Sequence, residues 1–161
     1  MFKNIKIVFF DFDDTLWIWK RNVENRNHEE ILLKDLYKDS IYNEYSGNIP
    51  QKMVELVDDL IKNDIKVYCV SICNNSLEVS RKKVFLEKYY NKQLANNLIG
   101  VYSLEEKLNI YNAISKEFDV LHNECAVIDD NIQSLRNCKK DNYNVFSSLE
   151  IIVQWNLYNN I

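Results

Sequence analysis

The chain has 161 residues, a length that suits one domain with a buried core and leaves too little chain for two. Its hydrophobic fraction of 47% and charged fraction of 27% are ordinary for globular proteins and argue against wholesale disorder. No apolar run approaches the roughly 18 residues of a membrane span, and no secretory leader is recognisable, so we expect a cytoplasmic protein without a membrane partner. The net charge of −4 disfavours nucleic acid as a partner.

The cysteines of the chain do not have the paired spacing of metal ligands. Most of them lie in or beside apolar runs, where a free cysteine behaves as a small hydrophobic residue. We therefore expect buried thiols for the four residues Cys69, Cys73, Cys125 and Cys138, with Cys73 as the possible exception because it follows a strand end where a site could lie.

Apolar runs rich in β-branched and aromatic residues predict strands that are covered on both faces. In chain order these runs are residues 5–10, 65–71, 97–102, 125–128 and 144–147. Four segments with helical periodicity lie between these runs, one in each gap: 50–63, 76–90, 103–118 and 131–140. This alternation predicts an α/β fold with a doubly wound, mainly parallel five-stranded sheet.

Residues 17–50 lie between the first predicted strand and the first predicted helix. They contain one helical pattern, at about 28–38, which is enough for a flap or a small lid and too little for a second domain. We therefore expect a single domain over residues 1–161. Trp17 and Trp19 could pack this insert against the sheet or form an aromatic wall above a site.

Polar residues stand where the predicted strands end. In a doubly wound sheet, ligands bind outside the carboxyl ends of the strands, so these residues are the candidates for a site. They are Asp11, Asp13, Ser71, Asp129 and Asp130, together with Lys107 in the first turns of a helix that begins at the same edge.

Carboxylates that converge at one edge repel one another, so they must be protonated, separated or neutralised by a cation. Hard oxygen ligands at a partly open site suit Mg²⁺. One carboxylate could attack phosphorus and form an aspartyl-phosphate, and a second could protonate the leaving oxygen and later activate water. A hydroxyl and an ammonium group, such as those of Ser71 and Lys107, could stabilise charge on the phosphoryl oxygens.

The motifs "VFFDFDDTL", "VYCVS" and "AVIDD", with Lys107 between the last two, occur in this order across residues 5–130. In this arrangement the chain resembles the haloacid dehalogenase (HAD) superfamily of phosphohydrolases. Within that superfamily it looks most like the magnesium-dependent phosphatase-1 group, which has a minimal cap. The resemblance implies a three-layer, Rossmann-like α/β fold of the HAD type with a short flap or lid insert.

The resemblance also implies roles for the acidic residues. Asp11 would be the nucleophile and a magnesium ligand, and Asp13 would be the general acid/base, with its main-chain carbonyl on the metal. Asp129 would bind magnesium through its carboxylate, and Asp130 would act through water or hold the ligands in place. Asp14 would be a turn residue.

The remaining implied roles concern the phosphoryl group. Ser71 and Lys107 would bind its oxygens, and Thr15 would brace the loop after the first strand. Lys82 and Lys83 are rivals for the place of Lys107.

These residues predict a Mg²⁺-dependent phosphatase acting on phosphomonoesters, whose substrate is a phosphorylated small molecule or a phosphoprotein. A receiver-like signalling domain uses similar residues, but there the acidic pair precedes the phosphorylated aspartate and the lysine comes last. A catalytically silent binding module with the same fold is the other alternative, against which the four intact aspartates at one edge argue.

Overall fold

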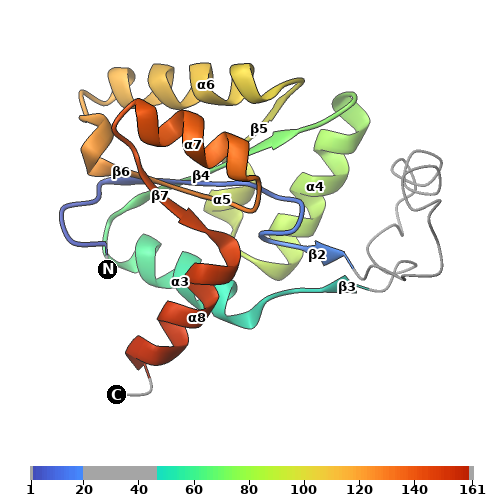
Figure 1. The fold of residues 1–161 in the computed structure, drawn as a ribbon. Helices are drawn as coiled ribbons and strands as arrows, with labels where there is room; N and C mark the ends of the chain where they lie inside the picture. Colours follow the sequence, from blue (N-terminus) through green and yellow to red (C-terminus); the bar gives the residue numbers. More distant parts are fainter. Residues whose placement is uncertain (1, 20–46, 160–161) are drawn as a thin grey trace.

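A computed structural model describes residues 2–19 and 47–159 (Figure 1). Its centre is a five-stranded parallel sheet with the strand order β5-β4-β1-β6-β7. The strands are β1 (Ile7–Phe10), β4 (Lys66–Ile72), β5 (Leu98–Val101), β6 (Cys125–Asp129) and β7 (Asn144–Ser147). All five predicted strands are present, and the predicted doubly wound α/β fold is confirmed.

Helices cover both faces of the sheet, which gives three layers (Figure 1). One face carries α6 (Leu104–Glu117) and α7 (Ile132–Lys140), and a short 3₁₀ helix, η1 (His122–Glu124), precedes β6. The opposite face carries α3 (Gln51–Lys62), α4 (Ser76–Tyr89), α5 (Lys92–Asn96) and α8 (Ser148–Asn159). The sequence did not predict α5 and α8. Among the described residues, no helix combines the length and apolar character that crossing a membrane requires.

The central strand β1 shows why the apolar runs form buried strands. Successive side chains of a strand point to opposite faces, and here both faces are covered. Val8 and Phe10 enter the core beneath α3, whereas Ile7 and Phe9 enter the core beneath α6 and α7. All four side chains are fully buried.

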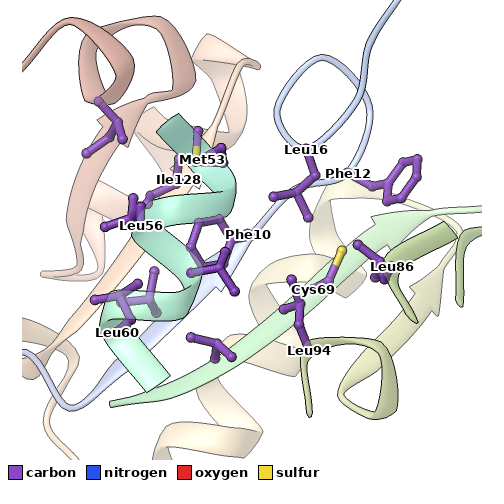
Figure 2. Close-up of a cluster of buried hydrophobic side chains, with 14 of the residues drawn as sticks. Phe10, Phe12, Leu16, Met53, Leu56, Leu60, Cys69, Leu86, Leu94 and Ile128 are labelled. Atoms are coloured by element: carbon purple, nitrogen blue, oxygen red, sulfur yellow. The ribbon is translucent and has the colours of Figure 1, made fainter. Parts of the chain in front are cut away.

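The larger core fills the space between the sheet and α3, α4 and α5. Figure 2 shows its central side chains, which come from strands, helices and the loop after β1: Phe10, Phe12, Leu16, Met53, Leu56, Leu60, Cys69, Leu86, Leu94 and Ile128. All four cysteines of the chain are free and buried, and Cys73, the possible exception, is buried as well.

Three helices begin at the carboxyl edge of the parallel sheet, and each begins with a side-chain cap. Asn75 accepts a hydrogen bond from the backbone of α4, Ser103 does so for α6, and Asn131 for α7. Such caps satisfy backbone N–H groups that have no partner within the helix. These polar caps mark the helix starts in a chain that has only two glycines and one proline.

The described ends of the predicted 17–50 insert form a small antiparallel ribbon of β2 (Ile18–Trp19) and β3 (Gly47–Asn48). A side chain at position 47 would collide with the indole of Trp17, so glycine is required there. Trp17 and Trp19 are buried, and their rings pack edge to face. The helical pattern at 28–38 lies outside the described residues, and the flap or lid remains a prediction.

Candidate active site

Asp11 and Asp129 lie side by side because β1 and β6 are parallel neighbours. Phe10 pairs with Ile128, and the backbone N–H of Asp11 donates to the carbonyl of Ile128 at 2.9 Å. Asp11 therefore follows β1 directly, whereas Asp129 is the last residue of β6 itself. Asp130, the next residue, is exposed at the same edge.

Asp11, Asp129 and Asp130 bring three carboxylates together. One oxygen from each lies within 4.8 Å of the other two. Oxygen ligands at this spacing, with two buried members and one exposed, fit a hard divalent cation at a partly open site. The carboxylate of Asp13 lies outside this group.

Lys107 lies between two of these carboxylates. Its Nζ atom donates to Oδ1 of Asp11 at 2.7 Å and to Oδ2 of Asp129 at 2.9 Å. The side chain comes from the first turn of α6 and is almost completely buried. The structure thus brings Lys107 to the carboxyl edge, as the sequence predicted for its position.

The electrostatics of this group show an excess of negative charge. Burial raises the pKa of Asp11 well above its ordinary value; Lys107 opposes this shift, and the carboxylates of Asp129 and Asp13 add to it. Burial alone would lower the pKa of Lys107, but Asp11 and Asp129 outweigh it and raise that pKa. Desolvation also raises the pKa of Asp130; the charges of Asp129 and Asp14 add to this shift, and a hydrogen bond with Asp11 opposes it. An additional cation would relieve this repulsion.

A second polar group, which we call the Lys82 cluster, consists of Ser71, Asp13, Glu78 and Lys82. The Nζ atom of Lys82 lies 2.9 Å from Oγ of Ser71, 2.8 Å from Oδ2 of Asp13 and 3.2 Å from Oε1 of Glu78. Ser71 is fully buried and stands inside β4 as its second-last residue, one position earlier than a strand-end residue. The Lys82 cluster therefore joins the predicted general acid/base to the predicted phosphate-binding hydroxyl.

The sequence did not predict the contacts of Lys82, which was named only as a rival of Lys107. A usable signal was present: Phe85 and Leu86 follow it by three and four positions, so all three lie on one side of α4. All three are buried, whereas Lys83 is exposed. Lys107 and Lys82 contact different pairs of predicted site residues: Lys107 contacts Asp11 and Asp129, and Lys82 contacts Asp13 and Ser71.

The loop after β1 is tight. The carbonyl of Phe12 accepts hydrogen bonds from the backbone of Thr15, Leu16 and Trp17. Asp14 has a φ of 58°, a left-handed conformation that aspartate tolerates better than most residues, in agreement with its predicted turn position. The hydroxyl of Thr15 is buried and has no hydrogen-bond partner in the part of the chain that the structure describes.

The indole of Trp19 connects this loop to the ribbon. Its Nε1 atom donates to Oδ1 of Asp13 at 3.0 Å, while the backbone N–H of Trp19 donates to Oδ1 of Asp14 at 3.2 Å. The two oxygens of the Asp13 carboxylate are therefore held from different elements, one by Trp19 of β2 and the other by Lys82 of α4.

No model of a known protein family matches the chain, and no curated protein does either. Solved structures do resemble it. An HAD-family enzyme from Bacteroides thetaiotaomicron, solved in complex with magnesium and inorganic phosphate, has a TM-score of 0.56 and 15% identity over 89% of this chain and 93% of that chain.

Two further similar structures are an HAD hydrolase of family IA, variant 3, from Entamoeba histolytica and CbbY from Rhodobacter sphaeroides in complex with phosphate. Each has a TM-score of 0.59 and 13% identity, and each match covers 89% of this chain. The match covers 83% of the Entamoeba chain and 85% of the CbbY chain. At such identities the similarity shows the fold alone. The chain has the α/β fold of HAD enzymes, and the predicted HAD-type fold is confirmed.

Proposed function

We propose that this chain is a Mg²⁺-dependent phosphatase of the HAD superfamily that hydrolyses phosphomonoesters through an aspartyl-phosphate on Asp11. The observation that carries the proposal is the convergence of Asp11, Asp129 and Asp130 on one point, with the ammonium of Lys107 against the first two. Enzymes with the same fold were solved with magnesium and with phosphate, which supports the same chemistry here.

In the first half of the reaction, a carboxylate oxygen of Asp11 attacks phosphorus. A bond forms between that oxygen and phosphorus, and the bond from phosphorus to the ester oxygen breaks. Asp13 donates a proton to the leaving oxygen, so that an alcohol departs. Lys107, at 2.7 Å from Asp11, orients the nucleophile and offsets the negative charge of the incoming phosphoryl group.

In the second half, Asp13 takes a proton from water, and the resulting hydroxide attacks the phosphorus of the aspartyl-phosphate. The bond from phosphorus to Asp11 breaks, which releases inorganic phosphate and restores the carboxylate. Ser71 donates a hydrogen bond to a phosphoryl oxygen in both halves.

The acidic group fits Mg²⁺ by its donor chemistry, since Mg²⁺ prefers carboxylate oxygens and keeps several waters. Asp11, Asp129 and Asp130 would hold the ion, and the main-chain carbonyl of Asp13 is a further candidate ligand. When bound, Mg²⁺ would supply positive charge that lets the phosphate dianion approach the carboxylates.

We also propose the finer assignments that the sequence suggested. The chain would belong to the magnesium-dependent phosphatase-1 group, with residues 17–50 as a small flap or lid on a single cytoplasmic domain of residues 1–161. Thr15 would brace the loop after β1 through its backbone N–H, which donates to the carbonyl of Phe12. A minimal cap would leave the site open to a phosphorylated small molecule or a phosphoprotein.

The test is hydrolysis of p-nitrophenyl phosphate by the wild type and by Asp11→Asn, each with Mg²⁺ and with a chelator. Turnover is expected only for the wild type with Mg²⁺, and Asp11→Asn should lose roughly a thousandfold or more because a carboxamide is a poor nucleophile. Asp58→Asn, at an exposed position on α3, is the control and should keep full activity. Metal-independent turnover, or turnover that survives in Asp11→Asn, would disprove the mechanism.

A further inference from the structure

We propose that Lys82 is a positioning residue of this site: it makes the Ser71 hydroxyl a hydrogen-bond donor toward the phosphoryl group and fixes the Asp13 carboxylate. This inference rests on the proposed function and adds a second lysine to it. Lys82 acts through Ser71 and Asp13, whereas Lys107 orients the nucleophile Asp11.

The first argument is burial. Lys82 has no exposed surface, and a buried ammonium is strongly unfavourable unless charged and polar partners surround it. Its Nζ atom lies near Asp13, Glu78 and Ser71, with the carbonyl of Ile72 at 3.4 Å. A lysine that served packing alone would bring its ammonium to the surface, as long aliphatic side chains allow. Here the ammonium instead points at two predicted site residues.

The second argument is the direction of a hydrogen bond. An ammonium group only donates, so Oγ of Ser71 must accept from Lys82 at 2.9 Å. The hydrogen of the Ser71 hydroxyl is then left to donate elsewhere. The nearby Cys73 thiol is a weak acceptor, whereas the oxygens of a phosphate dianion are strong ones. Lys82 therefore prepares Ser71 to donate to an anion.

The third argument is the geometry of Asp13. One of its oxygens accepts from Lys82 at 2.8 Å and the other from Trp19 at 3.0 Å. A carboxylate that is held at both oxygens loses little rotational freedom when the substrate binds. Because the same ammonium contacts Ser71, the position of the acid/base is tied to that of the phosphate-binding hydroxyl.

The experiment compares Lys82→Met with Lys83→Met, since Lys83 is the exposed neighbour on the same helix. Two measurements are made: the inhibition constant of inorganic phosphate, and the ratio of kcat/KM for an aryl phosphate with a good leaving group to kcat/KM for an alkyl phosphate with a poor one. Neither quantity depends on the fraction of folded enzyme, so a loss of stability alone would change neither.

Lys82→Met is expected to raise the inhibition constant of phosphate about tenfold, because Ser71 is no longer directed at the anion. The ratio of aryl to alkyl kcat/KM should rise about tenfold or more, because a misplaced Asp13 matters most when the leaving oxygen needs a proton. Lys83→Met should leave both quantities as in the wild type.

A double mutant tests the route through Ser71. If Lys82 acts on phosphate binding through that hydroxyl, Ser71→Ala/Lys82→Met should have the same phosphate inhibition constant as Ser71→Ala. Multiplicative effects of the two changes would overturn this part of the inference.

Lys82→Met leaves Glu78 and Asp13 without their cation, so Lys82→Met/Glu78→Gln is made alongside it to remove one of those charges. The same two shifts are expected in this variant. If the wild type has no metal-dependent turnover, the proposed function fails and this inference with it. If the wild type and Lys83→Met are active and both Lys82 variants match them in both measurements, this inference alone is wrong.

Discussion

The Nζ atom of Lys107 lies 2.7 Å from the carboxylate of Asp11 and 2.9 Å from that of Asp129, so one ammonium links the ends of two neighbouring strands. All three side chains are largely buried. With the nearby Asp130, the ammonium of Lys107 faces three carboxylates within the described part of the chain. This imbalance ties the stability of the fold to the cation content of the site.

Replacing Lys107 by Met should therefore destabilise the protein. Without the ammonium, Asp11 and Asp129 face each other with no neutralising charge, and breaking a buried ion pair in this way costs about 3–5 kcal/mol. The free energy of unfolding is measured by urea denaturation in the presence of a chelator.

The control is Lys116→Met, at an exposed position on the same helix, for which a change within about 0.5 kcal/mol is expected. Adding Mg²⁺ should recover part of the loss in Lys107→Met, because a divalent cation among the carboxylates replaces the missing charge. Equal stability of the Lys107 and Lys116 variants would show that the contacts of Lys107 contribute nothing.

Magnesium should also stabilise the wild type. A ligand that binds only the folded state at a hundred times its Kd adds about 2.7 kcal/mol to the free energy of unfolding. Asp130→Asn should require a higher Mg²⁺ concentration for the same stabilisation, because one of the three carboxylates is lost. Asp58→Asn serves as the control and should follow the wild-type curve. Identical Mg²⁺ dependence in Asp130→Asn would remove Asp130 from the metal site.

Asp13→Asn should reduce activity in a way that depends on the leaving group. Phosphate esters of acidic phenols depart without a proton, whereas esters of alkyl alcohols need one. The loss in kcat/KM should therefore grow as the pKa of the leaving alcohol rises, which a series of substituted phenyl and alkyl phosphates measures. A uniform loss across the series would contradict the general-acid role.

The layout of the sheet was predictable because its strands are rich in apolar residues; the central strands β1 and β6 are buried along their whole length, whereas the edge strand β7 is only partly buried. The helix α8 was missed because the apolar residues of its sequence, "SLEIIVQWNLYN", do not recur with a helical period. The helix α5 has five residues, too few for a periodic pattern. The ribbon was not predicted because it pairs Ile18–Trp19 with Gly47–Asn48, two segments far apart in the sequence, and local sequence patterns do not reveal such pairing.

The positions of Asp11 and Asp129 were predictable because parallel strands carry their ends to one edge. The partners of Lys82 were not. In the sequence, Glu78 and Lys82 form an i, i+4 pair of the kind common on solvated helix surfaces. Only the packing of α4 against the sheet turns this pair inward. The contact of Lys82 with Asp13, 69 positions away, could therefore be seen only in the folded structure.

Two tyrosines in the core beneath α6 offer a last prediction, independent of the catalytic proposal. The hydroxyl of Tyr111 is buried and has no hydrogen-bond partner among the described residues. The hydroxyl of the neighbouring Tyr143 donates to Oδ1 of Asn112 at 2.7 Å. A buried polar group without a partner is unfavourable, whereas a hydrogen bond of this kind contributes about 1 kcal/mol.

Tyr111→Phe should therefore raise the free energy of unfolding by about 1 kcal/mol, and Tyr143→Phe should lower it by about as much. Both changes remove one hydroxyl from neighbouring rings, whose centroids lie 6.2 Å apart. The effect on stability of losing a hydroxyl is therefore common to both variants, and their difference reports the hydrogen bonding. Urea denaturation of both variants measures the difference. A loss of stability in Tyr111→Phe equal to that in Tyr143→Phe would mean that the Tyr111 hydroxyl has a hydrogen-bond partner in solution, for which a buried water in this core is the nearest explanation.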